Sequence, residues 1–110
     1  MFSTEKKLSL SPGRRRLLEL MQQINFGRID GVTVRGGEPL FDPSPRVVRE
    51  IKFGSENGPR PELGIDDFVL KAQVVELFEH LDGLGDGKVG SIEVKYGLPF
   101  RMSVEELVQA

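Results

Sequence analysis

The chain has no cysteine and only one histidine among its 110 residues. Without cysteine it can form no disulfide, thiolate nucleophile, iron–sulfur cluster or cysteine zinc site. One histidine cannot build a histidine-rich metal cage. These two absences exclude several chemistries, and the sequence assigns no catalytic, metal-binding or cofactor-binding residue.

Long apolar runs are absent too. No segment approaches the roughly 18 apolar residues that a membrane helix needs. The first residues, MFSTEKKLSLSPGRRR, lack the apolar stretch of about 7–15 residues found in a secretory signal. We therefore expect no membrane contact and a cytoplasmic location.

Length and composition are ordinary for a globular protein. The sequence is 38% apolar and 29% charged, and its length lies near the usual size of one domain. We expect a single domain over residues 1–110, with a disordered or loosely held leader at about 1–10.

Charge is unevenly distributed, although the net charge is only −2. Residues 1–60 contain 11 Lys and Arg against 7 Asp and Glu, whereas residues 61–110 contain 4 against 10. A basic half can face nucleic acid, or it can dock on the acidic half within the chain or between copies. The acidic overall pI favours docking or simple solvation.

The first half begins with a predicted helix. Ser11 and Pro12 supply an N-cap and a proline at the first helical position, and Gly27 supplies a stop. Apolar residues recur between them at helical spacing, which predicts one buried face: Leu17, Met21 and Ile24.

A β-hairpin should follow this helix. Residues 28–35 are rich in β-branched side chains, a Gly-Gly pair offers a tight turn, and 39–42 should return. Two prolines then interrupt the strand, after which 46–53 shows an imperfect strand pattern. A short helix from Ser44 is the lesser alternative.

The second half repeats this order after a Gly/Pro-rich loop at 54–64. Asp66 can cap a helix that ends near Gly83. Its apolar stripe is the clearest in the chain: Leu70, Val74, Leu77, Phe78 and Leu81.

Strands are expected at 88–95 and 99–102, separated by a turn at Gly97. Residues 103–106 have the spacing of a capping box, which predicts a final short helical turn.

An internal repeat links the two halves. Shifting the sequence by 60 residues makes six of 24 positions identical without a gap, where background composition gives roughly one or two. We predict an α+β fold of two helix–hairpin (αββ) units, at about 14–53 and 66–110. One αββ unit cannot bury its own apolar face, so two should form an antiparallel sheet with the helices packed on one face. The middle segment is available to extend that sheet.

The segments LLELMQQINFGRIDGVTVRGGEPL and ELFEHLDGLGDGKVGSIEVKYGLP resemble the small YezD-like bacterial proteins. In those proteins a helix is followed by an aromatic-Gly step, a β-branched strand and a Gly turn. The resemblance implies a helix-plus-hairpin fold and a bacterial origin, but no active-site residues. This chain departs from the family in its length, its proline break and its second copy.

Residues 82–93 resemble an EF-hand calcium loop. Asp82, Asp86 and Glu93 occupy loop positions 1, 5 and 12, and Gly87 occupies the turn position. Leu84 replaces the ligand at position 3, and a predicted strand stands where the exit helix should be. The alternative is a Gly-rich turn that carries acidic residues, with Glu93 on the solvent side of its strand and the two aspartates free in the loop.

The basic half offers a candidate phosphate-binding face. Arg14, Arg15 and Arg16 open the first helix, where positive charge opposes the helix dipole. Few aromatic residues lie among these basic residues, and no sequence motif of an RNA- or DNA-binding module occurs. Other basic residues in this half could contribute: Lys6, Lys7, Arg28, Arg35, Arg46 and Arg49.

His80 is expected at the edge of the core, with Glu76, Glu79 and Asp82 nearby. A general acid–base site also needs a cleft and an oriented partner, and the sequence indicates neither. No phosphate-binding loop, dinucleotide fingerprint or nucleophile elbow is present.

The sequence therefore predicts a non-enzymatic protein-interaction module that self-associates through a sheet edge or through its oppositely charged halves. Nucleic-acid binding by the basic half is the first alternative. A degenerate calcium loop is the second.

Overall fold

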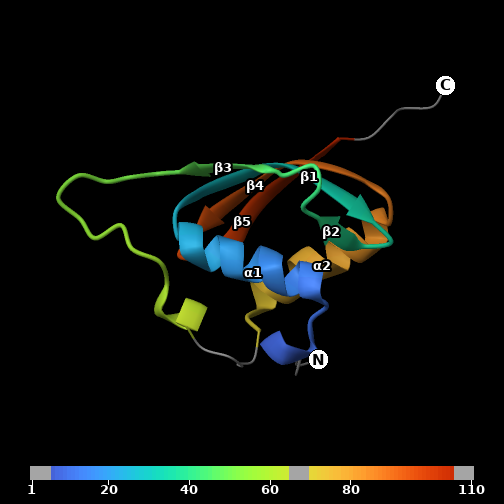
Figure 1. Ribbon diagram of the computed structural model, residues 1–110, viewed down its shortest axis with the longest axis horizontal. Helices are drawn as coiled ribbons and strands as arrows, with labels where there is room; N and C mark the ends of the chain where they lie inside the picture. Colours follow the sequence, from blue (N-terminus) through green and yellow to red (C-terminus); the bar gives the residue numbers. More distant parts are fainter. Residues whose placement is uncertain (1–5, 65–69, 106–110) are drawn as a thin grey trace.

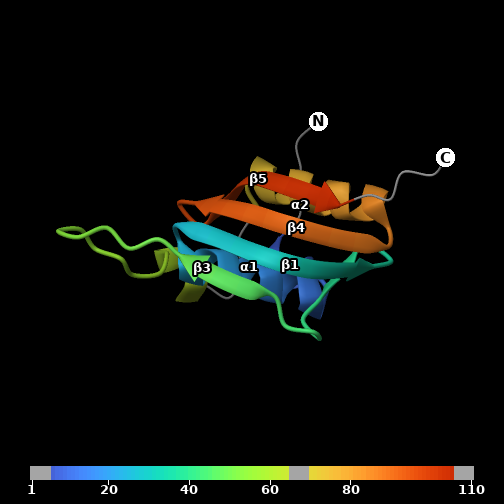
Figure 2. The ribbon, with the colours of Figure 1, turned by 90° about the horizontal axis from the view of Figure 1, so that it is seen from above.

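The computed structural model describes residues 6–64 and 70–105, which form one antiparallel sheet covered on one face by two helices (Figures 1 and 2). The α+β class and the antiparallel sheet are confirmed. The elements are α1 (Pro12–Ile24), β1 (Gly27–Arg35), β2 (Glu38–Leu40), β3 (Arg46–Arg49), α2 (Ala72–Leu84), β4 (Gly87–Lys95) and β5 (Leu98–Glu105), with short 3-10 turns η1 (Lys7–Ser9) and η2 (Pro61–Gly64).

Helix α1 begins as predicted. The Ser11 hydroxyl accepts a hydrogen bond from the Arg14 backbone N–H, and Pro12 occupies the first helical position, where its missing N–H costs nothing. The predicted stop at Gly27 is wrong. The helix ends at Ile24 because Asn25 takes a positive φ of 62°, and Gly27 already belongs to β1.

Helix α2 begins at Ala72, later than the predicted cap at Asp66, which lies outside the described residues. Lys71 is extended, so the buried Leu70 packs on the core from the chain before the helix. Gly85 ends the helix with a positive φ of 68°, close to the predicted end at Gly83.

Strands β1 and β4 form the centre of the sheet, whose order is β2-β1-β4-β5 with β3 also paired to β1. Ile29 stands opposite Ile92 and Val32 opposite Val89. Side chains alternate between the two faces of a strand, so these four point together toward the helices. Figure 2 shows β5 and β3 on opposite sides of the central pair.

Two local predictions in this sheet are corrected. Residues 103–105 continue β5 rather than opening a helical turn, because Lys88 and Val89 of β4 provide ladder partners for Glu105 and Val104. The strand predicted over 46–53 is only Arg46–Arg49, since its partner β1 begins at Gly27, opposite Arg49. The alternative helix from Ser44 does not form.

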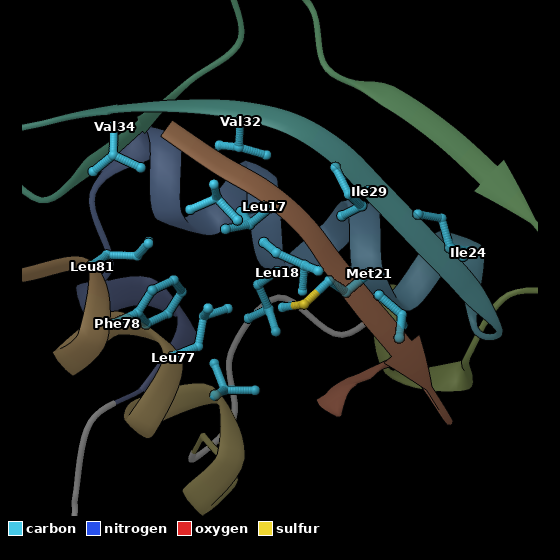
Figure 3. Packing of buried hydrophobic residues seen from close by; sticks show 14 of the residues in the cluster. Leu17, Leu18, Met21, Ile24, Ile29, Val32, Val34, Leu77, Phe78 and Leu81 are labelled. Carbon is cyan, nitrogen blue, oxygen red and sulfur yellow. The ribbon is translucent and has the colours of Figure 1, made fainter. Parts of the chain in front are cut away.

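The core lies between the helices and the sheet. Figure 3 shows Leu17, Leu18 and Met21 of α1 among side chains of β1 and α2. Leu10 packs against this core from the predicted leader. Among the described residues, fifteen buried apolar side chains belong to the core: Leu17, Leu18, Met21, Ile24, Ile29, Val32, Val34, Leu70, Val74, Leu77, Phe78, Leu81, Val89, Ile92 and Val94.

Each hairpin turn is bonded to the end of the helix in the other half of the chain. The Gly37 N–H donates to the Gly85 carbonyl at 2.9 Å, and the Gly97 N–H donates to the Asn25 carbonyl at 2.9 Å. These hydrogen bonds satisfy carbonyls at the helix ends that have no partner within the helix.

We expect Gly37→Ala to destabilise the protein more than Gly36→Ala. Both glycines have positive φ, 76° and 56°, which costs about 1–2 kcal/mol for alanine. A Cβ on Gly37 would also lie 2.6 Å from Asp82 Oδ1 and 3.2 Å from Asp82 Cα, whereas one on Gly36 meets nothing within 4 Å. Urea unfolding should show a total loss of about 2–4 kcal/mol for Gly37→Ala, and equal losses for the two variants would contradict this packing.

Candidate interaction surface

Arg14 is fixed inside the protein rather than presented to a ligand. Its Nη2 donates to the Gly37 carbonyl at 3.1 Å and forms an ion pair with Asp82 of α2. The guanidinium also lies over the Phe78 ring, 5.2 Å from its centroid, and the side chain is only 17% exposed. This contact docks the basic half on the acidic half within one chain.

The two neighbouring arginines have different partners. Arg15 Nη2 donates to the Leu8 carbonyl at 3.1 Å, which ties η1 to α1. The Arg16 guanidinium stacks over Phe41, 4.5 Å from the ring centroid. The three arginines therefore contact three separate parts of the fold and do not form one shared cluster.

The sheet face that points away from the helices carries both signs of charge. Arg28 of β1, Glu93 of β4 and Arg101 of β5 stand opposite one another across three strands. Arg101 Nε lies 3.5 Å from Glu93 Oε2, and Arg28 Nε donates to Asp30 at 3.0 Å. Such alternation leaves no uniform positive field along this face for a phosphate backbone.

The candidate calcium ligands do not come together. Asp82 belongs to α2 and pairs with Arg14, while Asp86 Oδ1 accepts the Gly36 backbone N–H at 2.8 Å. The expectation that both aspartates are free in the loop is wrong, because each is held by the first half of the chain. Glu93 lies on β4 between the buried Ile92 and Val94 and points to the opposite face. Residues 6–64 and 70–105 contain no group of three or more potential metal ligands.

His80 is more exposed than predicted, with 65% of its side chain accessible. Its Nε2 lies 3.9 Å from Glu76 Oε1, one helical turn earlier on α2. Both groups are on the helix surface, and this arrangement resembles an ordinary exposed helix pair.

The two edges of the sheet differ in their continuity. On the β1 side, β2 has three residues, the chain leaves the sheet through a cis Asp42-Pro43 peptide and Pro45, and β3 then resumes the pairing. On the other side, β5 pairs with β4 from Leu98 to Glu105, with register shifts between Val89 and Ser91 and between Glu93 and Val94. Within the described chain no strand pairs with the outer side of β5.

A groove of about 360 Å³ borders this open edge, between α2 and β5. Phe100 is 55% exposed and Val104 36% exposed. The apolar part of the groove is formed by Leu77, Pro99, Phe100, Met102 and Val104. A larger hollow of about 690 Å³ lies beside α1 at the other edge, where the proline excursion breaks the strand.

Sequence reasoning missed the length of β5. Apolar Met102 and Val104 alternate with Arg101, Ser103 and Glu105, which is a period-2 pattern typical of a half-buried strand. The capping-box spacing of residues 103–106 obscured that pattern.

We expect Arg14→Ala to destabilise the protein and Arg16→Ala to have little effect. Removing Arg14 leaves the Gly37 carbonyl and Asp82 without their shared donor, at a cost of about 1–3 kcal/mol. Exposed Arg16 contributes less than about 1 kcal/mol. Denaturant unfolding of the two variants measures the difference, and equal small effects would contradict a structural role for Arg14.

We expect calcium to leave the melting temperature unchanged. A ligand at 100 times its dissociation constant adds roughly 2.7 kcal/mol, which corresponds to about 10 °C or more for a domain of this size. The protein is melted with millimolar calcium and again with chelator. A clear rise that Glu93→Gln abolishes would establish a calcium loop and contradict the arrangement above.

Comparison with known proteins gives no further assignment: no family model, curated protein or solved structure matches the chain. Among the described residues, neither helix has the length and apolar character needed to cross a bilayer.

Proposed function

We propose that this protein is a non-enzymatic interaction module that self-associates by adding a strand at the β5 edge. The observation that carries this proposal is the contrast between the two edges. In the described chain β5 is one strand of eight residues with no strand on its outer side, whereas the opposite edge is divided into β2 and β3 around Pro43 and Pro45. An open edge presents unpaired backbone N–H and C=O groups, which template the pairing of another strand.

The side chains at this edge suit a buried contact. Val104 and Met102 point toward the α2 side, beside the groove, and Arg101, Ser103 and Glu105 point toward the other face. A partner strand would bury the apolar pair and leave the charged residues at the surface. The proposal assigns no catalytic role to His80, which is exposed on the surface of α2 with Nε2 3.9 Å from Glu76 Oε1.

We also propose that the fold consists of two duplicated αββ units. Helices α1 and α2 each have 13 residues and start at 12 and 72, and strands β1 and β4 each have nine residues and start at 27 and 87. The two strands have the same order of buried and exposed positions. The hydrogen bonds from Gly37 and Gly97 are equivalent under the same 60-residue shift.

This duplication supports the main proposal in a specific way. Under it, the β1–β4 ladder joins one unit to the next by antiparallel pairing of strand edges, with both helices on one face. Pairing at β5 would be the same kind of contact, made between copies instead of within the chain.

Nucleic-acid binding has less support. Arg14 forms an ion pair with Asp82, and Arg28 and Arg46 form ion pairs with Asp30. Binding to DNA or RNA that falls steeply with salt, and that weakens when all three arginines at 14–16 become alanine, would favour this alternative. The cytoplasmic location, the bacterial origin and the YezD-like relationship stay predictions.

We expect Val104→Lys to weaken self-association and Val47→Lys to leave it unchanged. Both valines lie on outer strands and are similarly exposed, 36% and 44%, but Val47 belongs to the broken edge. A lysine placed at a strand edge opposes further pairing. Ultracentrifugation from micromolar to millimolar protein should show a dimer for the wild type and for Val47→Lys, and a dissociation constant about tenfold higher for Val104→Lys.

Melting curves of both variants establish that each is folded. A wild type that is monomeric at millimolar concentration would refute self-association. Equal weakening by the two lysines would refute its location at β5.

A further inference from the structure

We infer that β5 pairs with β5 of a second copy in one register, antiparallel and centred on Ser103. This inference rests on the proposed function and specifies its contact. Residues 101–105 have the sequence Arg-Met-Ser-Val-Glu. When two copies run antiparallel about Ser103, Arg101 of each stands opposite Glu105 of the other, and Met102 stands opposite Val104.

The orientation of the side chains makes this pairing possible. Arg101 is paired with Glu93 in the β4 ladder and Glu105 with Lys88, so both point away from the helices. Met102 and Val104 are opposite the buried Ile92 and Val89, so they point to the helix side. Antiparallel pairing about an axis perpendicular to the sheet keeps these faces together, because neighbouring side chains across a ladder share a face.

Other symmetric registers within this segment are less favourable. If the two-fold axis between the copies passed between two residues, Arg101 would stand opposite a side chain that points toward the helices. Shifting the register by one residue places each side chain opposite one from the other face of the sheet. An axis on Arg101 or Glu105 places like charges opposite each other. Axes on Met102 or Val104 place Arg101 or Glu105, respectively, opposite Ser103 and form no Arg–Glu pair. Only the axis on Ser103 forms two opposite-charge pairs.

The bulge in β5 sets the limit of this ladder. Between Glu93 and Val94 the register shifts, so Phe100 has no partner on β4. A bulge bends its strand and disrupts regular pairing. From Arg101 to Glu105 every residue of β5 has a partner on β4, and the second register shift, between Val89 and Ser91, leaves the unpaired residue, Gly90, on β4. Arg101–Glu105 is the self-complementary segment.

Charge reversal tests this register. Arg101→Glu alone places the new carboxylate opposite Glu105 of the other copy, and Glu105→Arg alone places two arginines opposite each other. Each change should raise the dimer dissociation constant about tenfold, since two attractive pairs become repulsive. Mixing the two variants should restore pairing, because every contact in the mixed dimer joins opposite charges.

Native mass spectrometry distinguishes the mixed dimer from the two homodimers by mass, and ultracentrifugation gives its dissociation constant. Arg101→Glu also loses the contact with Glu93 in its own chain, but mixing cannot repair an effect within one copy. Recovery in the mixture therefore reports the contact between copies, and melting each variant alone establishes that both fold.

A mixed dimer with wild-type affinity supports the register. If the wild type is a dimer but neither charge reversal changes its affinity, or the two variants do not recover on mixing, the register is overturned. Pairing at β5 is then still tested separately by Val104→Lys. A wild-type monomer overturns the proposed function and this inference together.

Discussion

The antiparallel pairing of β1 with β4 is the contact on which the rest of the molecule depends. It places Ile29 opposite Ile92 and Val32 opposite Val89, so four buried side chains from the two halves meet under the helices. Without this ladder each helix would cover only a hairpin, and an isolated hairpin is at best marginally stable in water. The shared core is therefore a consequence of joining the halves at their strand edges.

Two charged residues, Arg14 and Asp86, reinforce the contact between the two halves of the chain. Arg14, in a helix first turn where a cation is unfavourable, reaches Gly37 and Asp82 and so fastens a hairpin turn to the other helix. Asp86 fastens the same turn through the Gly36 N–H. Considered separately, the arginines of α1 suggest phosphate binding and the aspartates at 82 and 86 suggest calcium binding. In the structure Arg14 forms an ion pair with Asp82, so residues of the two groups contact each other.

Much of the fold was accessible from the sequence because its signals are local and periodic. The apolar stripe of Leu17, Met21 and Ile24 and the β-branched run of β1 predict their elements directly. The start of α2 was not predictable in this way, and at the end of β5 the period-2 pattern of residues 101–105 competes with a helix-capping signal. A capping-box spacing at Ser103 is a local preference, and the ladder partners on β4 override it. The partners of Asp82 and Asp86 were inaccessible for a related reason, since they lie 68 and 50 residues away in the sequence, at Arg14 and Gly36.

The unequal edges constrain how copies could assemble. If both edges were open, pairing of one edge with the other would continue from copy to copy and build an open-ended sheet. Pro43 and Pro45 divide the edge beside β1 into the short strands β2 and β3, which leaves β5 as the longer uninterrupted strand at an edge. A molecule with one usable edge can pair only with the same edge of another copy, and such an isologous contact closes after two copies. The proline excursion that shortens the first edge would therefore be the feature that limits association at β5 to a dimer.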